Sequence, residues 1–342
     1  MDSAVEGLRP HENLEELILD SSGFGELKLP SWVDGMPCLR KLKLSNCLKL
    51  DRLPYLPSLK EFHISVSESV TLPDGGWERL SLPDGLTQLQ SLEDLCIFHC
   101  HKLESLPEGL GQLKKLKSLR IEYLKMLTHL PDSLGQLESL ETLKIHHCEK
   151  LESLPEGLGQ LKKLKSLTIK YLEMLTHLPD SLGQLESLET LVIYSCVKLE
   201  SLPEGFGQLK KLKSLRIEDL KMLTHLPDSL GQLESLETLK IKSCDKLESL
   251  PHSFEQLEVL KRLEIWTCKA LGSLPHGLQH LSHLRQLGIK DCPLVSERCK
   301  REGGADWSKI SHIPNICIDD EWIHGQRSIR LRRHQRFELK KG

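Results

Sequence analysis

The sequence has little net charge, few aromatic residues and no long apolar stretch. Its 342 residues carry a formal net charge of −3 and a pI near 6.6, so the chain as a whole lacks the basic footprint of a nucleic-acid-binding protein. No apolar run reaches the roughly 18 residues that a membrane-spanning helix needs, so we expect no span. Aromatic residues make up only 4% of the chain, which makes their positions informative.

Features of secreted proteins are also scarce. The N-terminus "MDSAVEGLRPHENLEEL" has neither the basic start nor the apolar stretch of a signal peptide. None of the three asparagines, at 13, 46 and 315, begins a glycosylation sequon, and the eleven cysteines are an odd number. These features predict a reducing, cytoplasmic environment. The end 324–342 is basic and is expected to be a disordered tail; it leaves a nuclear location open.

The motifs of common enzymes and metal sites are missing. There is no Gly-x-x-x-x-Gly-Lys-Ser/Thr phosphate loop, no Cys-x-x-Cys pair and no His-Glu-x-x-His. Histidines at 129, 177 and 225 recur two repeat units apart, roughly 10 Å by strand spacing, which is too far to share a metal. Cys96, His99 and His101 lie close in sequence but have no second ligand pair at finger spacing. We therefore predict no catalysis, no cofactor and no metal.

The chain is instead dominated by one repeat. Leu-Pro pairs at 82, 106, 130, 154, 178, 202, 226, 250 and 274 follow one another every 24 residues and define nine regular units over 82–297. Irregular units occupy 1–81, with an insertion, "LPDGGWERLS", near 72–81. A C-terminal cap is expected over 298–323.

Each unit reads "LPxxLGQLxxLxxLxIxxCxxLxx", the leucine-rich-repeat pattern. Alternation around Leu95 and Ile97 indicates a short strand with both side chains inward. One unit cannot bury its apolar residues, whereas stacked units can. The expected fold is an α/β leucine-rich-repeat solenoid: a curved horseshoe with a parallel sheet on its concave face and irregular or short helical segments on its convex side.

Two further periodic columns support this stack. Cysteine occupies one inward column at 47, 100, 148, 196, 244, 268 and 292, where we expect small, buried, reduced side chains rather than disulfides. Lys114 and Glu138 begin a column whose charge alternates from unit to unit, which predicts ion pairs on the outer surface.

Residues 106–153, 154–201 and 202–249 are three copies of one double unit, and they differ in nine of 48 columns. Six of the nine are assigned to strand positions that point away from the core. Unconstrained drift is one explanation, but equally exposed convex positions do not drift. We therefore expect a recognition surface that also collects the scarce aromatic residues. The candidate partner-binding residues on this concave face are Phe98, His99, Arg120, Glu122, Tyr123, Lys144, His146, His147, Lys170, Tyr171, Val192, Tyr194 and Trp266. Truncation of Tyr123, Tyr171 or Tyr194 should weaken binding and barely change thermal stability, because these side chains lie outside the core.

Both ends of the chain add a resemblance. The opening "EGLRPHENLEELILDSSGFGELKLPSWVDGMPCLRKL", continued by "LPYLPSLKEF", resembles the leucine-rich-repeat region of plant intracellular nucleotide-binding leucine-rich-repeat (NLR) disease-resistance proteins. The segment "CPLVSERCKREGGADWSKISHIPNICID" at 292–319 resembles the closing segment of their coiled-coil type. The resemblance covers about residues 5–320. It implies protein recognition in innate immunity: sensing of a pathogen effector, or restraint of a nucleotide-binding module that this sequence does not show.

Two other functions stay open at this point. The repeats would also suit a substrate-recruiting adaptor of a ubiquitin ligase or another intracellular scaffold, although no ligase domain is visible. An extracellular receptor ectodomain is the third candidate, against which the missing signal peptide, sequons and paired capping cysteines count. All three need a protein partner.

Overall fold

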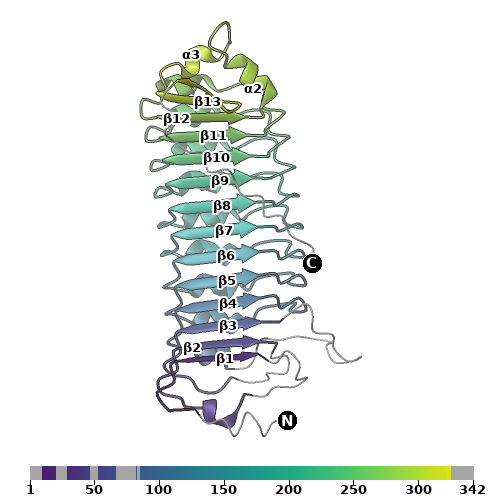
Figure 1. Ribbon diagram of the computed structural model, residues 1–342, viewed down its shortest axis with the longest axis vertical. Coiled ribbons are helices and arrows are strands. Elements are labelled where there is room, and N and C mark those ends of the chain that lie inside the picture. Colours follow the sequence, from purple (N-terminus) through teal and green to yellow (C-terminus); the bar gives the residue numbers. More distant parts are fainter. Residues whose placement is uncertain (1–9, 21–28, 47–52, 67–81, 83–84, 325–342) are drawn as a thin grey trace.

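The computed structural model of the protein describes residues 10–20, 29–46, 53–66, 82 and 85–324 (Figure 1). The predicted insertion at 72–81, Cys47 and all of the predicted tail 324–342 except His324 lie outside these residues; His324 belongs to the last strand rather than to a tail. In the described part, fourteen strands form one sheet in sequence order. They are β1 (Glu16–Asp20), β2 (Lys41–Ser45), β3 (Glu61–Ser65), β4 (Asp94–Phe98), β5 (Ser118–Glu122), β6 (Thr142–His146), β7 (Ser166–Lys170), β8 (Thr190–Tyr194), β9 (Ser214–Glu218), β10 (Thr238–Lys242), β11 (Arg262–Trp266), β12 (Gln286–Lys290), β13 (Asn315–Ile318) and β14 (Glu321–His324).

The strands form because each unit repeats the same alternation of inward and outward side chains. In β5, Leu119 and Ile121 are fully buried while the three other residues are partly exposed. Equivalent residues pair in register, so Leu119 lies beside Leu143 and Ile121 beside Ile145. From β1 to β13 every pairing is parallel, as predicted. Figure 1 shows the resulting ladder of short strands.

The opposite side of the solenoid consists of 3-10 helices, in agreement with the predicted short helical segments. They are η1 (Ser31–Val33), η2 (Leu86–Gln88), η3 (Glu108–Gln112), η4 (Asp132–Gln136), η5 (Glu156–Gln160), η6 (Asp180–Gln184), η7 (Glu204–Gln208), η8 (Asp228–Gln232), η9 (His252–Gln256) and η10 (His276–His280). From η3 to η10 each begins directly after the proline of its Leu-Pro pair, which occupies the N-cap position with an extended ψ and whose ring fixes φ. Neighbouring units approach closely here, since a Cβ on Gly135 would lie 2.1 Å from the Gly157 carbonyl oxygen.

The buried cysteine column is confirmed for the described residues. Cys100, Cys148, Cys196, Cys244, Cys268 and Cys292 are at most 1% exposed, and all are free thiols. Burial raises the pKa of Cys148 to about 12, so this thiol stays protonated in the folded chain.

The C-terminal end closes the core with two short helices, α2 (Pro293–Arg298) and α3 (Trp307–Ile310), before β13. Ile310, Ile313, Ile316 and Ile318 are buried, and Trp307 packs against the same core. The last strand departs from the predicted parallel order, because β14 pairs antiparallel with β13. Asp319 and Asp320, both with positive φ, form the tight turn that reverses the chain.

A buried charge cluster holds this end to the last regular repeat. The carboxylate of Asp306 is fully buried and lies 3.0 Å from Arg298 Nε and 2.7 Å from Lys309 Nζ. It also accepts a hydrogen bond from the backbone N–H of Leu274, while Lys309 donates to the carbonyl of Leu274. Burial alone would raise the pKa of Asp306, but the hydrogen bonds from these donors outweigh burial and lower the pKa below its usual value. The carboxylate therefore stays charged.

Candidate functional site

The outward side chains of β1 to β12 form one face of the sheet, which we call the strand face. Strand register places Arg120 beside Lys144 and Glu122 beside His146 on adjacent strands. The same register continues through Lys170, which lies beside Tyr194. Of the thirteen predicted partner-binding residues, twelve are partly exposed on or directly beside this face. Val192 is the exception, because it is only 8% exposed and so offers little contact area.

One column of predicted strand residues lies just beyond the strands. Strand β5 ends at Glu122 and β6 at His146, so Tyr123 and His147 are the first residues after them. Both have left-handed backbone, with φ of 58° and 54°. The assignment of these positions to strands was therefore wrong by one residue. We call this the left-handed column; it contains Asn46, His99, Tyr123, His147, Tyr171, Ser195, Asp219, Ser243, Thr267 and Asp291.

Four consecutive members of this column stack their rings. The ring of Tyr123 lies parallel to His99, with centroids 4.5 Å apart, and parallel to His147, at 4.3 Å. His147 stacks in turn on Tyr171 at 4.0 Å. Tyr194 ends the run edge-on to Tyr171, at 5.0 Å and an interplanar angle of 80°. We call these five rings the aromatic ladder. It brings together five predicted partner-binding residues.

The stacking changes one expectation from the sequence. Tyr123 and Tyr171 each contact ring neighbours in adjacent units, and offset-stacked or edge-on aromatic pairs contribute about 0.5–1.5 kcal/mol each. Their truncation should therefore lower stability as well as remove exposed contact area. The hydroxyl of Tyr171 and burial together raise the pKa of Tyr194 to about 12, so this phenol stays neutral at physiological pH.

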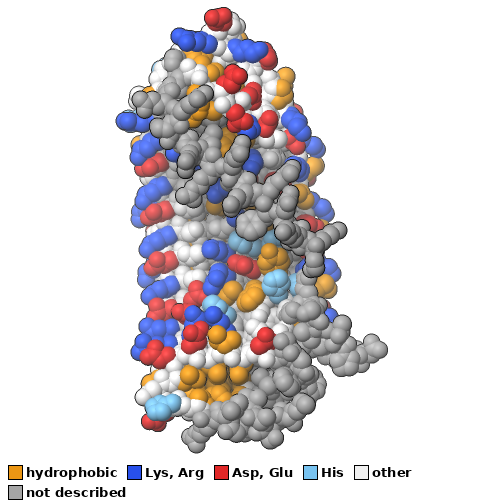
Figure 2. All heavy atoms as spheres, viewed as in Figure 1, with side chains coloured by type: hydrophobic (Ala, Val, Ile, Leu, Met, Phe, Trp, Pro, Cys, Tyr) orange, Lys and Arg blue, Asp and Glu red, His pale blue; other side chains and the backbone are white. Residues whose placement is uncertain are grey.

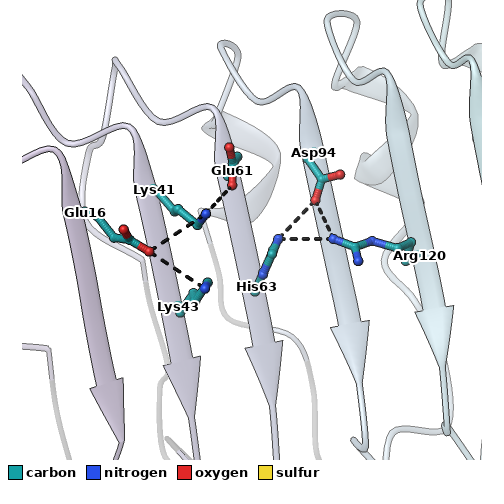
Figure 3. Close-up of polar contacts among 7 residues, drawn as sticks. All are labelled: Glu16, Lys41, Lys43, Glu61, His63, Asp94 and Arg120. Atoms are coloured by element: carbon teal, nitrogen blue, oxygen red, sulfur yellow. Dashed lines mark hydrogen bonds and ion pairs between the residues drawn. The ribbon is translucent and has the colours of Figure 1, made fainter.

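A charged network that sequence reasoning missed lies on the first strands (Figure 3). Lys41 Nζ lies 2.9 Å from Glu61 and 3.8 Å from Glu16, and Lys43 lies 3.7 Å from Glu16. A separate group follows on β3 to β5, where His63 Nε2 and Arg120 Nη2 each lie 3.1 Å from Asp94 Oδ1.

Asp94 holds that second group in its charged state. Burial raises the pKa of its carboxyl, but hydrogen bonds from His63, Ser118 and Arg120 outweigh burial and hold the pKa well below its usual range. The carboxylate compensates the charge of Arg120, a predicted partner-binding residue. The 24-residue period could have predicted this ion pair, because it places Arg120 and Asp94 at neighbouring outward positions of consecutive units.

Ion pairs also cover the strand face at β9 to β11. Arg216 contacts Glu218 at 2.6 Å, and Lys240 contacts Glu264 at 2.9 Å. Lys242 Nζ lies 5.6 Å above the ring of Trp266, a cation–π geometry. A small hollow is lined by these side chains. Trp266 lies on β11, three strands from the end of the aromatic ladder, so the structure does not bring it together with the ladder.

The outer surface confirms the predicted charge alternation. Lys114 pairs with Glu138 at 3.3 Å, Lys162 with Glu186 at 3.2 Å and Lys210 with Glu234 at 3.2 Å. Figure 2 shows basic and acidic side chains alternating along the edge where the strands begin. Directly before the strands, Lys117 contacts Glu93 and Lys165 contacts Glu141. Exposed pairs of this kind contribute only about 0–1 kcal/mol each, so they set register more than stability.

Within the described residues, no group of three His, Cys, Asp or Glu side chains could hold a metal ion. Nor does any helix in the described ranges have the length and apolar character required to cross a bilayer.

Two protein families match parts of the chain. The family described as "Leucine-rich repeat region" matches residues 122–222, and the family described as "R13L1/DRL21 LRRs" matches residues 1–67. Both agree with the observed strand-and-turn units. The chain folds as a leucine-rich-repeat solenoid.

Solved structures support the solenoid fold. The leucine-rich repeat domain of the type III effector XopL is 25% identical, with a TM-score of 0.55, over 73% of this chain and 76% of that one. An internalin (inlF) from Listeria monocytogenes is 18% identical, with a TM-score of 0.54, over 82% of this chain and 75% of that one. No curated protein sequence matches the sequence of this chain. The coiled-coil NLR type stays a prediction.

Proposed function

We propose that this leucine-rich-repeat solenoid is a non-catalytic protein-recognition module of plant innate immunity, acting in the cytoplasm. Its partner would be a pathogen effector or a nucleotide-binding receptor module. The observation that carries the proposal is a coincidence of two patterns. Six of the nine columns that differ among the three double-unit copies are the columns that hold the aromatic ladder and the charged strand-face residues.

The chemistry of the ladder suits a protein partner. Tyrosine presents a rigid apolar ring with a polar tip, and such residues are enriched among the anchors of protein interfaces. Tyr123, Tyr171 and Tyr194 are only partly buried, so each keeps surface for a partner. Stacking in adjacent units holds the rings in place, which reduces the side-chain entropy lost on binding.

The plant assignment is supported by two observations. The opening residues resemble NLR disease-resistance proteins, and the R13L1/DRL21 family matches residues 1–67 of the same region. Neither matching family is described as an enzyme. The adaptor and ectodomain alternatives have no comparable observation in their favour.

Photo-crosslinking tests the proposal directly. A photoreactive amino acid replaces Tyr194 on the strand face or Lys162 on the outer surface, and both proteins are exposed to extracts of infected and healthy plant leaves. A protein crosslinked only from position 194 is identified, purified and titrated against the native chain by calorimetry. The proposal expects an effector or a nucleotide-binding module.

Variants then decide whether the strand face carries the affinity. Truncating a central interface anchor lowers the binding free energy by about 2 kcal/mol or more. We therefore expect Tyr123→Ala, Tyr171→Ala and Tyr194→Ala each to weaken binding of the identified partner roughly 30-fold. Lys114→Ala and Lys162→Ala on the outer surface are the matched controls. Loss of binding in the lysine variants, with full binding in the tyrosine variants, contradicts the proposal.

A further inference from the structure

One section of the strand face combines uncompensated positive charge with an aromatic border. We call it the β6–β8 window and define it by six outward side chains: Lys144, His146, Thr168, Lys170, Val192 and Tyr194. The three strands read TLKIH, SLTIK and TLVIY, so none of them contains an acidic residue. The window therefore lacks the internal carboxylates found elsewhere on this face.

The two lysines of the window have no ion-pair partner among the described residues. Their neighbours on both sides do: Arg120 contacts Asp94, Arg216 contacts Glu218 and Lys240 contacts Glu264. Long cationic side chains on this face are therefore usually compensated within the chain. Lys144 and Lys170 are exceptions, as is Lys242, which lies over the ring of Trp266, and all three are partly buried rather than fully solvated.

The surroundings of Lys170 are electropositive as well as desolvated. Burial, then the charges of Arg216 and Lys144, lower the pKa of its ammonium group, while Glu218 and Glu122 at the flanks offset part of this effect. Burial and the same two window lysines lower the pKa of His146 to about 4, so this imidazole is neutral at physiological pH. An anion placed here would meet less solvent screening than at the more exposed lysines of the outer surface.

Aromatic rings border this positive section. Lys170 Nζ lies 5.9 Å from the ring centre of Tyr194, and Tyr194 meets Tyr171 edge-on. Beneath them, Thr168 and Val192 are 9% and 8% exposed and form a low floor between longer side chains. The middle copy is distinctive here, since its sister copies carry Arg120 and Lys144, or Arg216 and Lys240, at these two positions. An apolar side chain of a ligand could lie against the rings.

The positive section is narrow, which limits the size of the anion. Glu122 on β5 and Glu218 on β9 flank it four strands apart, roughly 19 Å at ordinary strand spacing. Glu149 and Glu173 lie beyond the left-handed column at its edge. A long polyanion would extend onto these carboxylates. A nucleic-acid base would also find no free face of His147 on which to stack, because Tyr123 and Tyr171 cover both faces of that ring.

We propose that the β6–β8 window binds a short acidic segment of a partner protein. One or two Asp or Glu carboxylates would pair with Lys144 and Lys170, and a neighbouring apolar side chain would pack on Tyr171 and Tyr194. This inference rests on the proposed function as a recognition module and adds the chemistry of the segment that the strand face recognises.

Fluorescence anisotropy with defined peptides tests it. The probe is a fluorescein-labelled peptide in which two pairs of glutamate and leucine are separated by serine and glycine, and its reference replaces each glutamate with glutamine. The native chain should prefer the acidic peptide, and the preference should shrink as salt rises from roughly 50 to roughly 300 mM. Lys144→Gln and Lys170→Gln should each lower the affinity roughly 3- to 10-fold.

Two further variants control for charge and folding. Lys163→Gln removes an exposed lysine of the same repeat unit that has no ion pair among the described residues, and binding should not change. Lys170→Glu reverses the charge but introduces the residue that the sister copies carry at 122 and 218. The variant should therefore fold normally and no longer bind the acidic peptide.

Several outcomes would overturn the inference. They are equal binding of the acidic and glutamine peptides, an equal loss in Lys163→Gln, or tighter lysine-dependent binding of a single-stranded oligonucleotide or of phosphatidylserine vesicles. A crosslinked partner that needs the tyrosines but ignores Lys144→Gln, Lys170→Gln and salt would leave the proposed function standing and remove only this inference.

Discussion

Replacing His147 with serine tests whether the aromatic ladder stabilises the repeats that carry it. His147 lies in the middle of the ladder, 4.3 Å from Tyr123 and 4.0 Å from Tyr171 between ring centroids. His147→Ser removes both contacts. Serine already occupies the same left-handed position at 195 and 243, with φ of 54° at both, so the backbone accommodates it.

The expected cost follows from these two contacts. Aromatic pairs contribute about 0.5–1.5 kcal/mol each, and the partial exposure of the rings places this site in the lower part of that range, at about 1–2 kcal/mol in total. The loss is local, because each repeat contacts only its neighbours. This local loss would be a small fraction of the free energy measured by global unfolding of a long solenoid. Hydrogen exchange of individual amides measures the local opening directly.

Three backbone amides report on the ladder. The N–H of Tyr123 donates to the carbonyl of His146, that of His147 to Lys170, and that of Tyr171 to Tyr194. In His147→Ser these amides should exchange roughly 5- to 30-fold faster, because a free-energy change of about 1.4 kcal/mol is tenfold in the opening equilibrium.

A matched variant separates stacking from backbone effects. Ser243→Ala changes the same column at the same φ but lies outside the aromatic ladder, so exchange near 123, 147 and 171 should stay at its native rate. If His147→Ser accelerates those amides no more than Ser243→Ala does, the rings stack without stabilising the chain and the reasoning is refuted.

Three other predictions concern packing and ionisation. Gly135→Ala would place a Cβ 2.1 Å from the Gly157 carbonyl oxygen and should lower the free energy of unfolding, measured in urea, by about 1–3 kcal/mol. Gly272→Ala, whose added Cβ would have its nearest contact at 3.8 Å, should leave that free energy unchanged. Equal effects of the two variants would contradict the packing argument. The Cys148 thiol should resist thiol reagents at neutral pH until the chain unfolds, and rapid native labelling would show that the strand faces the other way. His146, with a folded pKa of about 4 against about 6.5 when unfolded, should stay neutral by NMR at pH 6; its contribution to stability is present above about pH 6.5 and is lost as the pH falls toward 4.

The fold was predictable because the repeat period alone determines which residues are buried. A leucine that recurs every 24 residues must occupy the same place in each unit, so the inward columns of Leu119 and Cys148 could be assigned without coordinates. The alternating outer charges follow from the same argument. The antiparallel β14 could not be assigned in this way, since it lies past the last repeat and its direction depends on the turn at Asp319 and Asp320.

The site was predictable as a set of columns but not as a geometry. Sequence differences among the copies identified positions 123, 146 and 147, but not the parallel stacking of the rings. That stacking depends on a left-handed residue directly after each strand. A usable signal was present, because Asn46, Asp219 and Asp291 share the column and Asn and Asp favour left-handed backbone. The unpaired lysines of the β6–β8 window could be found only once the carboxylate partners of their neighbours were known.

The left-handed column also bears on why the ladder exists. A turn that needs positive φ is served well by Asn, Asp or His, as at Asn46, His99 and Asp291, whereas the bulkier ring of tyrosine at such a position is uncommon and costs backbone energy. Four successive units nevertheless carry His or Tyr there. Stacking offsets part of that cost only if several adjacent units carry rings together, so a single ring would gain little. A purely structural requirement would be met by the smaller residues of later units, such as Ser195 and Asp219. The continuous run from His99 to Tyr171 therefore argues for a role in contact with another molecule. It lies beside the strands that carry Lys144 and Lys170, two lysines for which no carboxylate partner is present among the described residues.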